Sequence, residues 1–356
     1  MMPEHAPLEV AVVRRDREWK LFLDLCAPLS HEISDLPEPD EWARILGRLE
    51  QTRFEALAYH NLRARGLDDA VPGEVMAHLR AANAQALARY HLLGEMVSPH
   101  LEALAREVDF LVLKGTAWAH TVYPEPHLRQ SGDIDLLVTE EDQAAAGRVL
   151  EERGFEGSWE CGEDHGPQFS LSIPHAGIVY MELHPALGKA ADHPHVSASE
   201  AWKCKQTVVM WGSGYRAPGR TLSIAHVAAQ LATDIYMRPY VRYLVDLCYL
   251  LDGGGVATEE LAGVLAAGGL CGLAYCAAEL ADIAIPLPRP RLAARLATAL
   301  VALAGCEVRL GMPTGWWGIA SRVAALMLFD RNKDRALRLR SYAAHAWARR
   351  RHSTHG

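Results

Sequence analysis

Arg129-Gln-Ser-Gly-Asp133-Ile-Asp135-Leu-Leu-Val138 places two carboxylates one residue apart at the start of an apolar run, directly after a glycine-containing turn. Successive side chains of a strand point to opposite faces, so Asp133 and Asp135 share a face while Ile134 packs behind it. Two carboxylates about 7 Å apart along a strand repel each other unless a cation lies between them. Because oxygen ligands suit a hard divalent ion, the stretch predicts a magnesium–nucleotide site, although strand ends also carry solvated aspartates without any ion.

The stretch upstream of this acid pair supports the same interpretation. Residues 110–116 read as a short buried strand that breaks at Gly115 and leads into a helical stretch over about 117–123. A glycine at that junction lets the backbone approach a phosphate, and the helix that follows would present free N–H groups to it.

A third acid follows downstream on another expected strand. Residues 178–184 are rich in β-branched and aromatic side chains, and Tyr180, Glu182 and His184 alternate onto one face. If this strand lies beside the first, Glu182 joins the acid pair and completes a set of three carboxylates.

These motifs occur in the order Lys114-Gly115, then 129–138, then Glu182-Leu-His184. In that order they resemble the nucleotidyltransferase superfamily built on the DNA polymerase β-like fold. More narrowly, they are similar to a broad and largely uncharacterised group of bacterial nucleotidyltransferase family proteins. The helical region over 222–247 is similar to the group as well.

The resemblance implies an α+β fold in three parts. A small mixed β-sheet forms the nucleotidyltransferase core over 108–213. A helical N-terminal region over 1–107 precedes it, and a larger helical C-terminal region over 214–356 follows it. The chain has 356 residues, half of them apolar, which is enough to bury an ample core.

The resemblance also implies a chemistry for the three acids. Asp133, Asp135 and Glu182 would be the catalytic residues and would hold Mg²⁺, with two ions expected, next to ATP or another nucleoside triphosphate. Glu182 would be either a ligand of the second ion or the general base for the acceptor. The residues expected to bind the nucleotide phosphates are Lys114, Gly115, Thr116, Arg129 and Ser131.

Several of these residues have alternative interpretations that need no substrate. Lys114 could serve merely as a structural ion pair that neutralises the acids. Arg129 could be solvated or pair with Asp133. Thr116 could be a helix N-cap. For His184, a supporting hydrogen-bonding role on the acceptor side is expected rather than metal ligation.

The resemblance implies a Mg²⁺-dependent enzyme that moves a nucleoside monophosphate, AMP from ATP, onto a hydroxyl or similar nucleophile. The alternative is a non-catalytic nucleotide-binding relative, or a regulatory or toxin–antitoxin component of the same superfamily. The net charge of −8 favours a small-molecule or peptide acceptor over nucleic acid. The C-terminus is basic over 331–340 and 349–351, which we interpret as a solvated helix face.

Cysteine usage and apolar runs indicate the compartment. Seven cysteines lack a Cys-x-x-Cys pair, and Cys248, Cys271 and Cys276 lie in apolar helical contexts, which is typical of reduced thiols. The first residues contain no continuous apolar run, so we expect no secretory signal and a cytoplasmic location. The run over 261–278 is long enough for a membrane span, but Gly268-Gly269 favours two short buried helices.

Other stretches yield expectations that the structure can test. Residues 41–65 and 140–153 show helical apolar spacing, and a long helix is expected after Pro72-Gly73. Residues 202–211 are expected to add a strand.

Two further stretches that contain histidine allow more than one interpretation. His226, Gln230 and Asp234 form a polar stripe at helical spacing, facing either the acceptor or solvent. His193 and His195 are interpreted as part of a surface loop rather than a zinc site.

Overall fold

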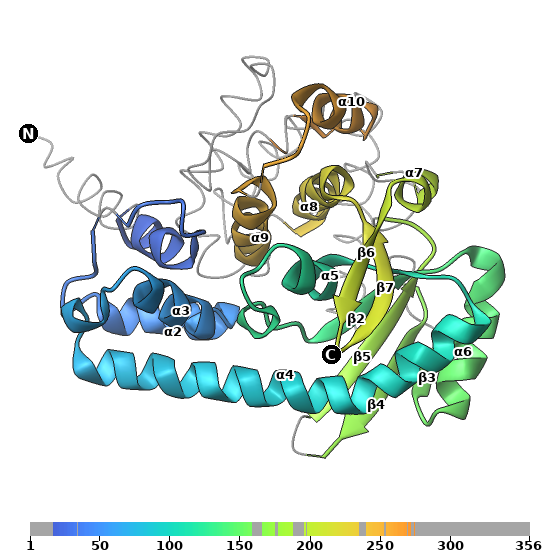
Figure 1. The fold of residues 1–356 in the computed structure, drawn as a ribbon, viewed down its shortest axis with the longest axis horizontal. Coiled ribbons are helices and arrows are strands. Elements are labelled where there is room, and N and C mark those ends of the chain that lie inside the picture. Colours follow the sequence, from blue (N-terminus) through green and yellow to red (C-terminus); the bar gives the residue numbers. More distant parts are fainter. Residues whose placement is uncertain are drawn as a thin grey trace, which may run out of the picture.

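The structure is a computed structural model, and it describes residues 17–33, 35–158, 166–174, 177–187, 196, 198–234, 240–252, 254–268, 270, 271 and 274. In these residues, helices pack around a five-stranded sheet and a separate two-stranded hairpin (Figure 1). The expected α+β architecture with a mixed sheet is therefore confirmed. The expected basic segments at the C-terminus, the loop with His193 and His195, and Cys276 all lie outside the described residues.

The N-terminal part of the described chain is helical. Residues 17–26 form a helix. The long helix α4 runs along one side of the sheet (Figure 1) and is not interrupted at Pro99. The stretch over 41–65 is not one continuous helix, because Arg53 adopts a left-handed φ of 58° and ends its first half. The elements are α2 (Trp42–Thr52), α3 (Glu55–Ala64), η1 (Asp68–Ala70) and α4 (Gly73–Glu107).

The sheet has the strand order β1-β2-β5-β4-β3. Its central pair, β2 and β5, is parallel, and the other neighbours pair antiparallel. The strands are β1 (Leu111–Val112), β2 (Asp133–Leu137), β3 (Glu156–Ser158), β4 (Gln168–Ile173) and β5 (Gly177–His184). The apolar half of β2 is fully buried, which explains why the run after the acid pair is continuous rather than alternating.

The helix α6 (Glu140–Glu152) follows β2, as expected from the sequence. Thr139 caps its N-terminus by accepting a hydrogen bond from the backbone N–H of Asp142, and acidic residues fill its first turn. Gly154, with a φ of 89°, ends the segment. The connection carries the chain back so that β5 can pair parallel to β2.

The stretch around Trp202 differs from the expectation of a single strand. Its first half forms α7 (Ala198–Lys203), and only its second half forms the strand β6 (Lys205–Met210). A two-residue turn at Trp211-Gly212 with φ values of 48° and 86° joins β6 to β7 (Ser213–Pro218). The division into three regions stays a prediction, although β7 extends past the boundary expected at residue 213.

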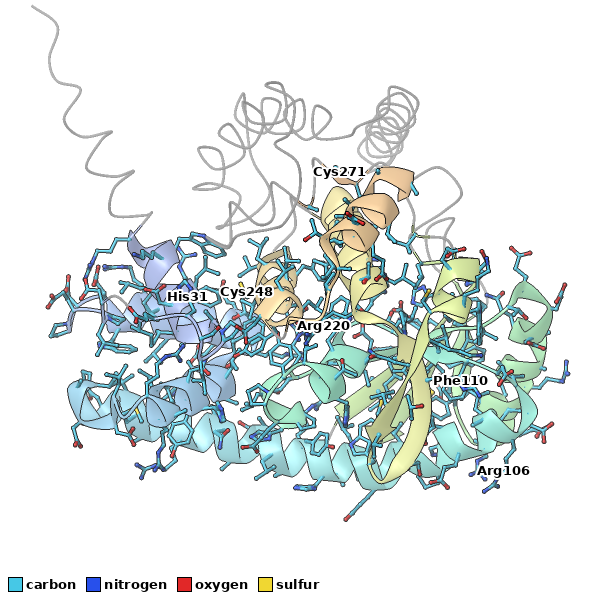
Figure 2. The ribbon with its side chains drawn as sticks, turned by 45° about the horizontal axis from the view of Figure 1, so that its top comes forward. His31, Arg106, Phe110, Arg220, Cys248 and Cys271 are labelled. Atoms are coloured by element: carbon cyan, nitrogen blue, oxygen red, sulfur yellow. The ribbon has the colours of Figure 1, made fainter. Side chains whose placement is uncertain are left out.

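Three further helices lie on the side of the sheet away from α4 (Figure 1). They are α8 (Arg220–Asp234), α9 (Tyr240–Asp252) and α10 (Thr258–Gly268), and glycines with positive φ separate the last two. No helix in the described ranges is long and apolar enough to cross a membrane. Cys248 on α9 is a free thiol (Figure 2), as expected.

Candidate active site

The parallel pairing of β2 and β5 brings the acids together. Asp135 is aligned with Glu182, and Asp133 is aligned with Tyr180. Aligned residues of neighbouring strands point to the same face, so Asp133, Asp135, Glu182 and His184 all share one face of the sheet. The expectation that the third acid lies on a strand beside the acid pair is met.

Asp135 lies at the centre of this face and is almost fully buried. Its Oδ1 accepts hydrogen bonds from Lys114 Nζ at 2.6 Å and from His184 Nε2 at 2.7 Å. His184 Nε2 also lies 3.4 Å from Glu182 Oε2, while Gln168 Nε2 donates to the other oxygen of Glu182 at 2.9 Å. Lys114 therefore forms the ion pair that the sequence left open, and His184 links two of the acids.

The three acids of the site differ in the direction in which their surroundings shift the pKa. Burial opposes ionisation of Asp135, but the charge of Lys114 and the hydrogen bond from His184 hold its pKa well below the usual range. The hydrogen bond from His184 likewise lowers the pKa of Glu182 against the effect of burial. In contrast, burial and the neighbouring charge of Asp135 raise the pKa of Asp133. Asp133 is therefore the acid whose negative charge is least compensated.

These residues fit a divalent cation. One ligand atom each from Asp135, Glu182 and His184 lie within 4.8 Å of one another. Carboxylate oxygens are hard ligands, and Asp133 adds a third carboxylate to the same face. Lys114 and His184 share Oδ1 of Asp135, so an ion that takes this oxygen competes with at least one of them.

The helix α5 (Lys114–Thr121) supplies the second part of the site. Lys114, its first residue, has a left-handed φ of 50°, a strained conformation that aims its side chain at Asp135. A Cβ on Gly115 would stand 3.1 Å from Ser131 Oγ, so glycine allows the helix to approach the loop before β2. Thr116 is not an N-cap, because it lies inside the helix, is buried and donates to the carbonyl of Asp133 at 3.2 Å.

Ser131 contacts the acid pair directly, since its Oγ donates to Asp133 Oδ1 at 3.1 Å. Arg129 is placed differently from both expectations for it. It is buried, and its Nε and Nη2 donate to the two oxygens of Asp246 on α9 at 2.6 and 2.8 Å. Its Nη1 donates to the carbonyl of Gln130 at 2.9 Å. Its two-point contact is thus made to a carboxylate of the protein, which leaves it neither solvated nor paired with Asp133.

Asp246 was not predicted to be part of the site. It is fully buried and accepts a further hydrogen bond from Tyr123 Oη at 2.7 Å. A single acid inside the apolar run of residues 243–251 was the available signal, because an acid is rarely buried without a partner.

His226 and Gln230 on α8 are buried and hydrogen-bonded to each other at 3.2 Å. The solvent-facing interpretation is therefore wrong for these two residues, while the side chain of Asp234 lies outside the description. Burial, together with the charge of Lys114, lowers the pKa of His226 to about 3. His226 thus stays neutral behind the acid face.

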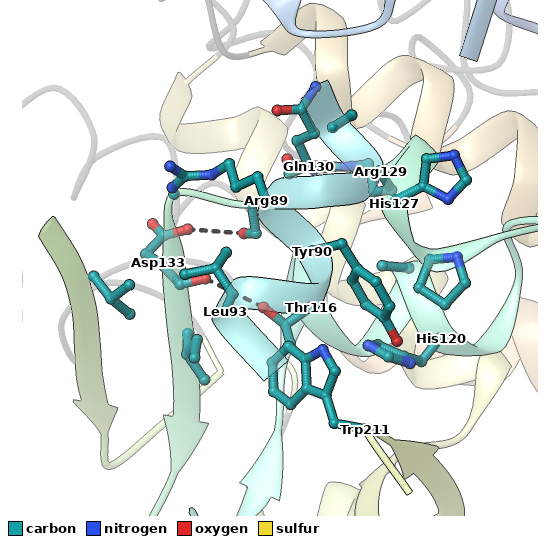
Figure 3. A pocket seen from close by; sticks show the side chains of 17 residues that line it. Arg89, Tyr90, Leu93, Thr116, His120, His127, Arg129, Gln130, Asp133 and Trp211 are labelled. Atoms are coloured by element: carbon teal, nitrogen blue, oxygen red, sulfur yellow. Dashed lines mark hydrogen bonds between the residues drawn. The ribbon is translucent and has the colours of Figure 1, made fainter. Parts of the chain in front are cut away.

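A cleft of about 580 Å³, part of it open to solvent, adjoins the acids at Asp133. Its walls come from α4, α5 and the loop before β2. Tyr90, His120 and Trp211 lie at one end of the cleft, whereas Arg89 and Asp133 lie at the other (Figure 3). The site therefore combines an acid face with an adjoining cleft that has an aromatic end and a cationic end.

Comparisons with known proteins agree with the resemblance that the acid motif carries. The model of a family described as uncharacterised nucleotidyltransferase matches residues 38–285. No curated protein matches the chain.

Three solved structures are similar to the chain. The solution structure of the antibiotic-resistance factor ANT(2'')-Ia has 16% identity and a TM-score of 0.36, over 50% of this chain and 91% of that one. A crystal structure of ANT(2'')-Ia in complex with adenylyl-2''-tobramycin has 16% identity and a TM-score of 0.36, over 49% and 95%. An antigenic nucleotidyltransferase-like protein from Paracoccidioides brasiliensis has 15% identity and a TM-score of 0.35, over 49% and 85%.

Proposed function

The chain belongs to the family of uncharacterised nucleotidyltransferases, and from this premise we propose that it transfers AMP from ATP to a nucleophilic acceptor. The observation that carries the proposal is the alignment of Asp135 with Glu182 on parallel neighbouring strands, with Asp133 on the same face. Three carboxylates on one face are the ligand set that metal-dependent phosphoryl transfer needs.

Asp133, Asp135 and Glu182 would hold the magnesium ions. When bound, these ions offset the charge of the triphosphate and lower the pKa of the acceptor hydroxyl. The pKa of Glu182 is lowered, which makes its carboxylate a weak base, and this suits a metal ligand better than a proton acceptor. We therefore assign Glu182 the ligand role among the two that its sequence position allowed.

The loop before β2 and the start of α5 would position the phosphates. Lys114 brings a positive charge to the acid face, and Gly115 lets the backbone of α5 come close to Ser131. Ser131 and Thr116 hold the side chain and the backbone of Asp133, so a substrate bound there meets an acid with a fixed orientation. Positioning of the reactants and charge compensation account for most of the rate enhancement in such reactions.

The acceptor would be a small molecule or a peptide with a hydroxyl or similar nucleophile. The adjoining cleft supports this proposal because its apolar and aromatic walls suit an organic ligand of modest size. The net negative charge of the chain is unfavourable for an extended nucleic-acid backbone.

Transfer can be tested without knowing the acceptor. The full chain is incubated with α-phosphate-labelled ATP, Mg²⁺ and fractionated cell extract, and labelled products are separated and identified. Asp133→Asn and Asp135→Asn should each lower labelling by about a hundredfold or more, because each removes a negative charge that the ions need. Asp69→Asn, a change at an exposed acid in η1, is the matched control and should label normally.

The alternative of a non-catalytic nucleotide-binding relative makes the opposite prediction. In that case ATP binds to the protein, but no fraction and none of the nucleoside triphosphates yields a labelled product. Full labelling by the Asp133→Asn and Asp135→Asn double variant would exclude the mechanism proposed for these acids.

A further inference from the structure

Three guanidinium groups from separate elements meet at the loop that precedes the acid pair. Arg53 lies between α2 and α3, and its Nη1 is 3.6 Å from where a Cβ on Gly132 would stand. Arg242 on α9 donates through Nη2 to the carbonyl of Gln130. Arg89 on α4 lines the cleft together with that same loop (Figure 3).

Within this arginine cluster, the charges of Arg53 and Arg242 are not compensated by ion pairs to described residues in the way that those of the acid face are. In the described part of the chain, neither Arg53 nor Arg242 forms an ion pair with a carboxylate. Burial and the neighbouring charges of Arg129 and Arg53 lower the pKa of Arg242 to about 9. Its buried Nε has no hydrogen-bond partner among the residues that the structure describes. A buried donor without an acceptor is unfavourable, so the arrangement indicates that an anion completes it.

The backbone of Arg53 gives a second reason to assign a role to its side chain. Arg53 ends α2 with a φ of 58°, in the left-handed region where glycine is the favoured residue. Its backbone N–H donates to the carbonyl of Glu50 and caps the helix, but glycine would make the same bond without the conformational cost of a side chain in this region. The guanidinium of Arg53 reaches the loop next to Asp133, which indicates that this side chain has a role in the site.

We propose that Arg53, Arg89 and Arg242 form a polyphosphate site that holds the β- and γ-phosphates of the nucleoside triphosphate, an inference that rests on the proposed transfer reaction. Guanidinium groups recognise phosphate oxygens by paired, charge-assisted hydrogen bonds, and several are needed to offset a polyanion. Arg89 lines the cleft together with Asp133, and Arg53 and Arg242 lie against the loop just before it, which is where a triphosphate must be if its α-phosphorus is to reach the acids.

This assignment gives the arginines a defined part in the reaction. The acceptor oxygen forms a new bond to the α-phosphorus and gives up its proton to solvent water, which reaches the partly open cleft. The bond from the α-phosphorus to the oxygen that bridges it to the β-phosphate breaks, and the electron pair leaves with pyrophosphate. The arginine cluster stabilises the negative charge that accumulates on this leaving group.

The proposal is tested by calorimetric titration of the full chain with inorganic tripolyphosphate and, separately, with AMP. Arg53→Gly and Arg89→Gln should each weaken tripolyphosphate binding by about tenfold, the effect of removing one charge-assisted contact. AMP lacks the β- and γ-phosphates, so its binding should change less than twofold. Arg63→Gln, at an exposed arginine on α3 that pairs with Asp68, is the matched control and should bind both ligands as the parent does.

Arg53→Gly also separates this role from a purely structural one. Glycine keeps the left-handed backbone, so the variant should melt at the parent temperature or above it while losing affinity for tripolyphosphate. Unchanged tripolyphosphate affinity in both variants would overturn the proposal, as would equal losses for AMP and tripolyphosphate.

The two proposals fail in different ways. If the variants lose tripolyphosphate affinity but the parent never labels a product, the arginine site stands and the transfer reaction falls. If the parent transfers AMP and both variants keep its KM for ATP, the reaction stands and the arginine site falls.

Discussion

The side chain of Asp135 joins the acid face to the side chains of Lys114 and His184. One of its oxygens accepts from both Lys114 and His184, and His184 in turn lies beside Glu182. Among the described residues no cation forms an ion pair with Asp133, which is contacted by the neutral hydroxyl of Ser131. The two aspartates are therefore unequal, although they stand one residue apart on the same strand.

The buried pair of Arg129 and Asp246 should contribute strongly to stability. Arg129→Ala leaves a fully buried carboxylate with Tyr123 as its remaining donor, so we expect a loss of about 3–5 kcal/mol in the free energy of unfolding. Urea denaturation followed by circular dichroism measures this loss. The double variant Arg129→Leu with Asp246→Leu removes both charges and should lose less than Arg129→Ala. A loss of stability in the double variant that equals or exceeds the loss in Arg129→Ala would contradict this account of the pair.

His226 should make the stability depend on pH in mildly acidic solution. Its pKa is about 3 in the folded protein and near 6.5 when unfolded, so between these values only the unfolded chain binds the proton. The stability contributed by neutral His226 is therefore present above pH 6.5 and decreases as the pH falls. By pH 5 the loss is about 2 kcal/mol.

The measurement for His226 is the difference between the parent and His226→Gln in urea denaturation at pH 7.5, 6 and 5. The stability of the variant should fall less steeply than that of the parent, since glutamine does not titrate. Other titrating groups act equally on both proteins and cancel. Parallel pH profiles would show that His226 is not the neutral, buried group described above.

Contacts between elements explain features that the sequence did not reveal. The turn between β6 and β7 places Trp211 against α4, where a Cβ on Gly94 would come within 2.3 Å of the indole Cδ1. Trp211 itself has a left-handed φ of 48°, so the turn carries an aromatic residue where asparagine or glycine is preferred. The close approach of hairpin and helix forms one end of the cleft.

This contact should reverse the usual effect of a glycine-to-alanine change in a helix. Gly94→Ala displaces the indole, so we expect a loss of about 1–3 kcal/mol in the free energy of unfolding. Gly47→Ala in α2 meets no atom within 4 Å and should instead gain about 0.5–1 kcal/mol. Thermal and urea denaturation of both variants measure the two signs. A gain in Gly94→Ala would show that Trp211 does not pack against α4.

The sequence predicted those elements whose signals are local. The strand with Asp133 and Asp135, the helix closed at Gly154 and the strand with Glu182 all follow from alternation, capping and turn residues. The alignment of Asp135 with Glu182 was expected only through the family resemblance, because pairing between strands is not a local property.

The contacts of Arg129 could not be predicted in the same way. Its partner Asp246 lies 117 residues away, and no spacing rule connects the two. The break of the helix at Arg53 was missed for a different reason. Its apolar spacing continues across the break, and a left-handed arginine leaves no mark in a hydrophobic pattern.

In the whole molecule, one hydrophobic cluster joins all three expected regions. It includes Phe22 and Leu49 from the N-terminal part, Leu136 from the sheet and Leu244 from α9. A domain that folds alone needs a core of its own. We therefore expect the described residues of the three regions to unfold together as one cooperative unit.

Equilibrium unfolding should accordingly show one transition. Far-UV circular dichroism and intrinsic tryptophan fluorescence should give coincident curves in urea, because helices and sheet lose the same core together. An isolated fragment of residues 108–213 should show no cooperative transition, since the partners of its buried faces are missing. Cooperative melting of that fragment would support an independent core.

The long-range anchor of Arg129 has a consequence for biosynthesis. A ribosome that has just added Arg129 must add another 117 residues before Asp246 exists to fix the loop. Because chains fold progressively from the N-terminus, the acidic strands emerge well before this anchor does. A nascent polypeptide interrupted after Glu182 but before Asp246 would carry all three acids without the contact that anchors the loop before them, so the proposed transfer has to wait until α9 has been made.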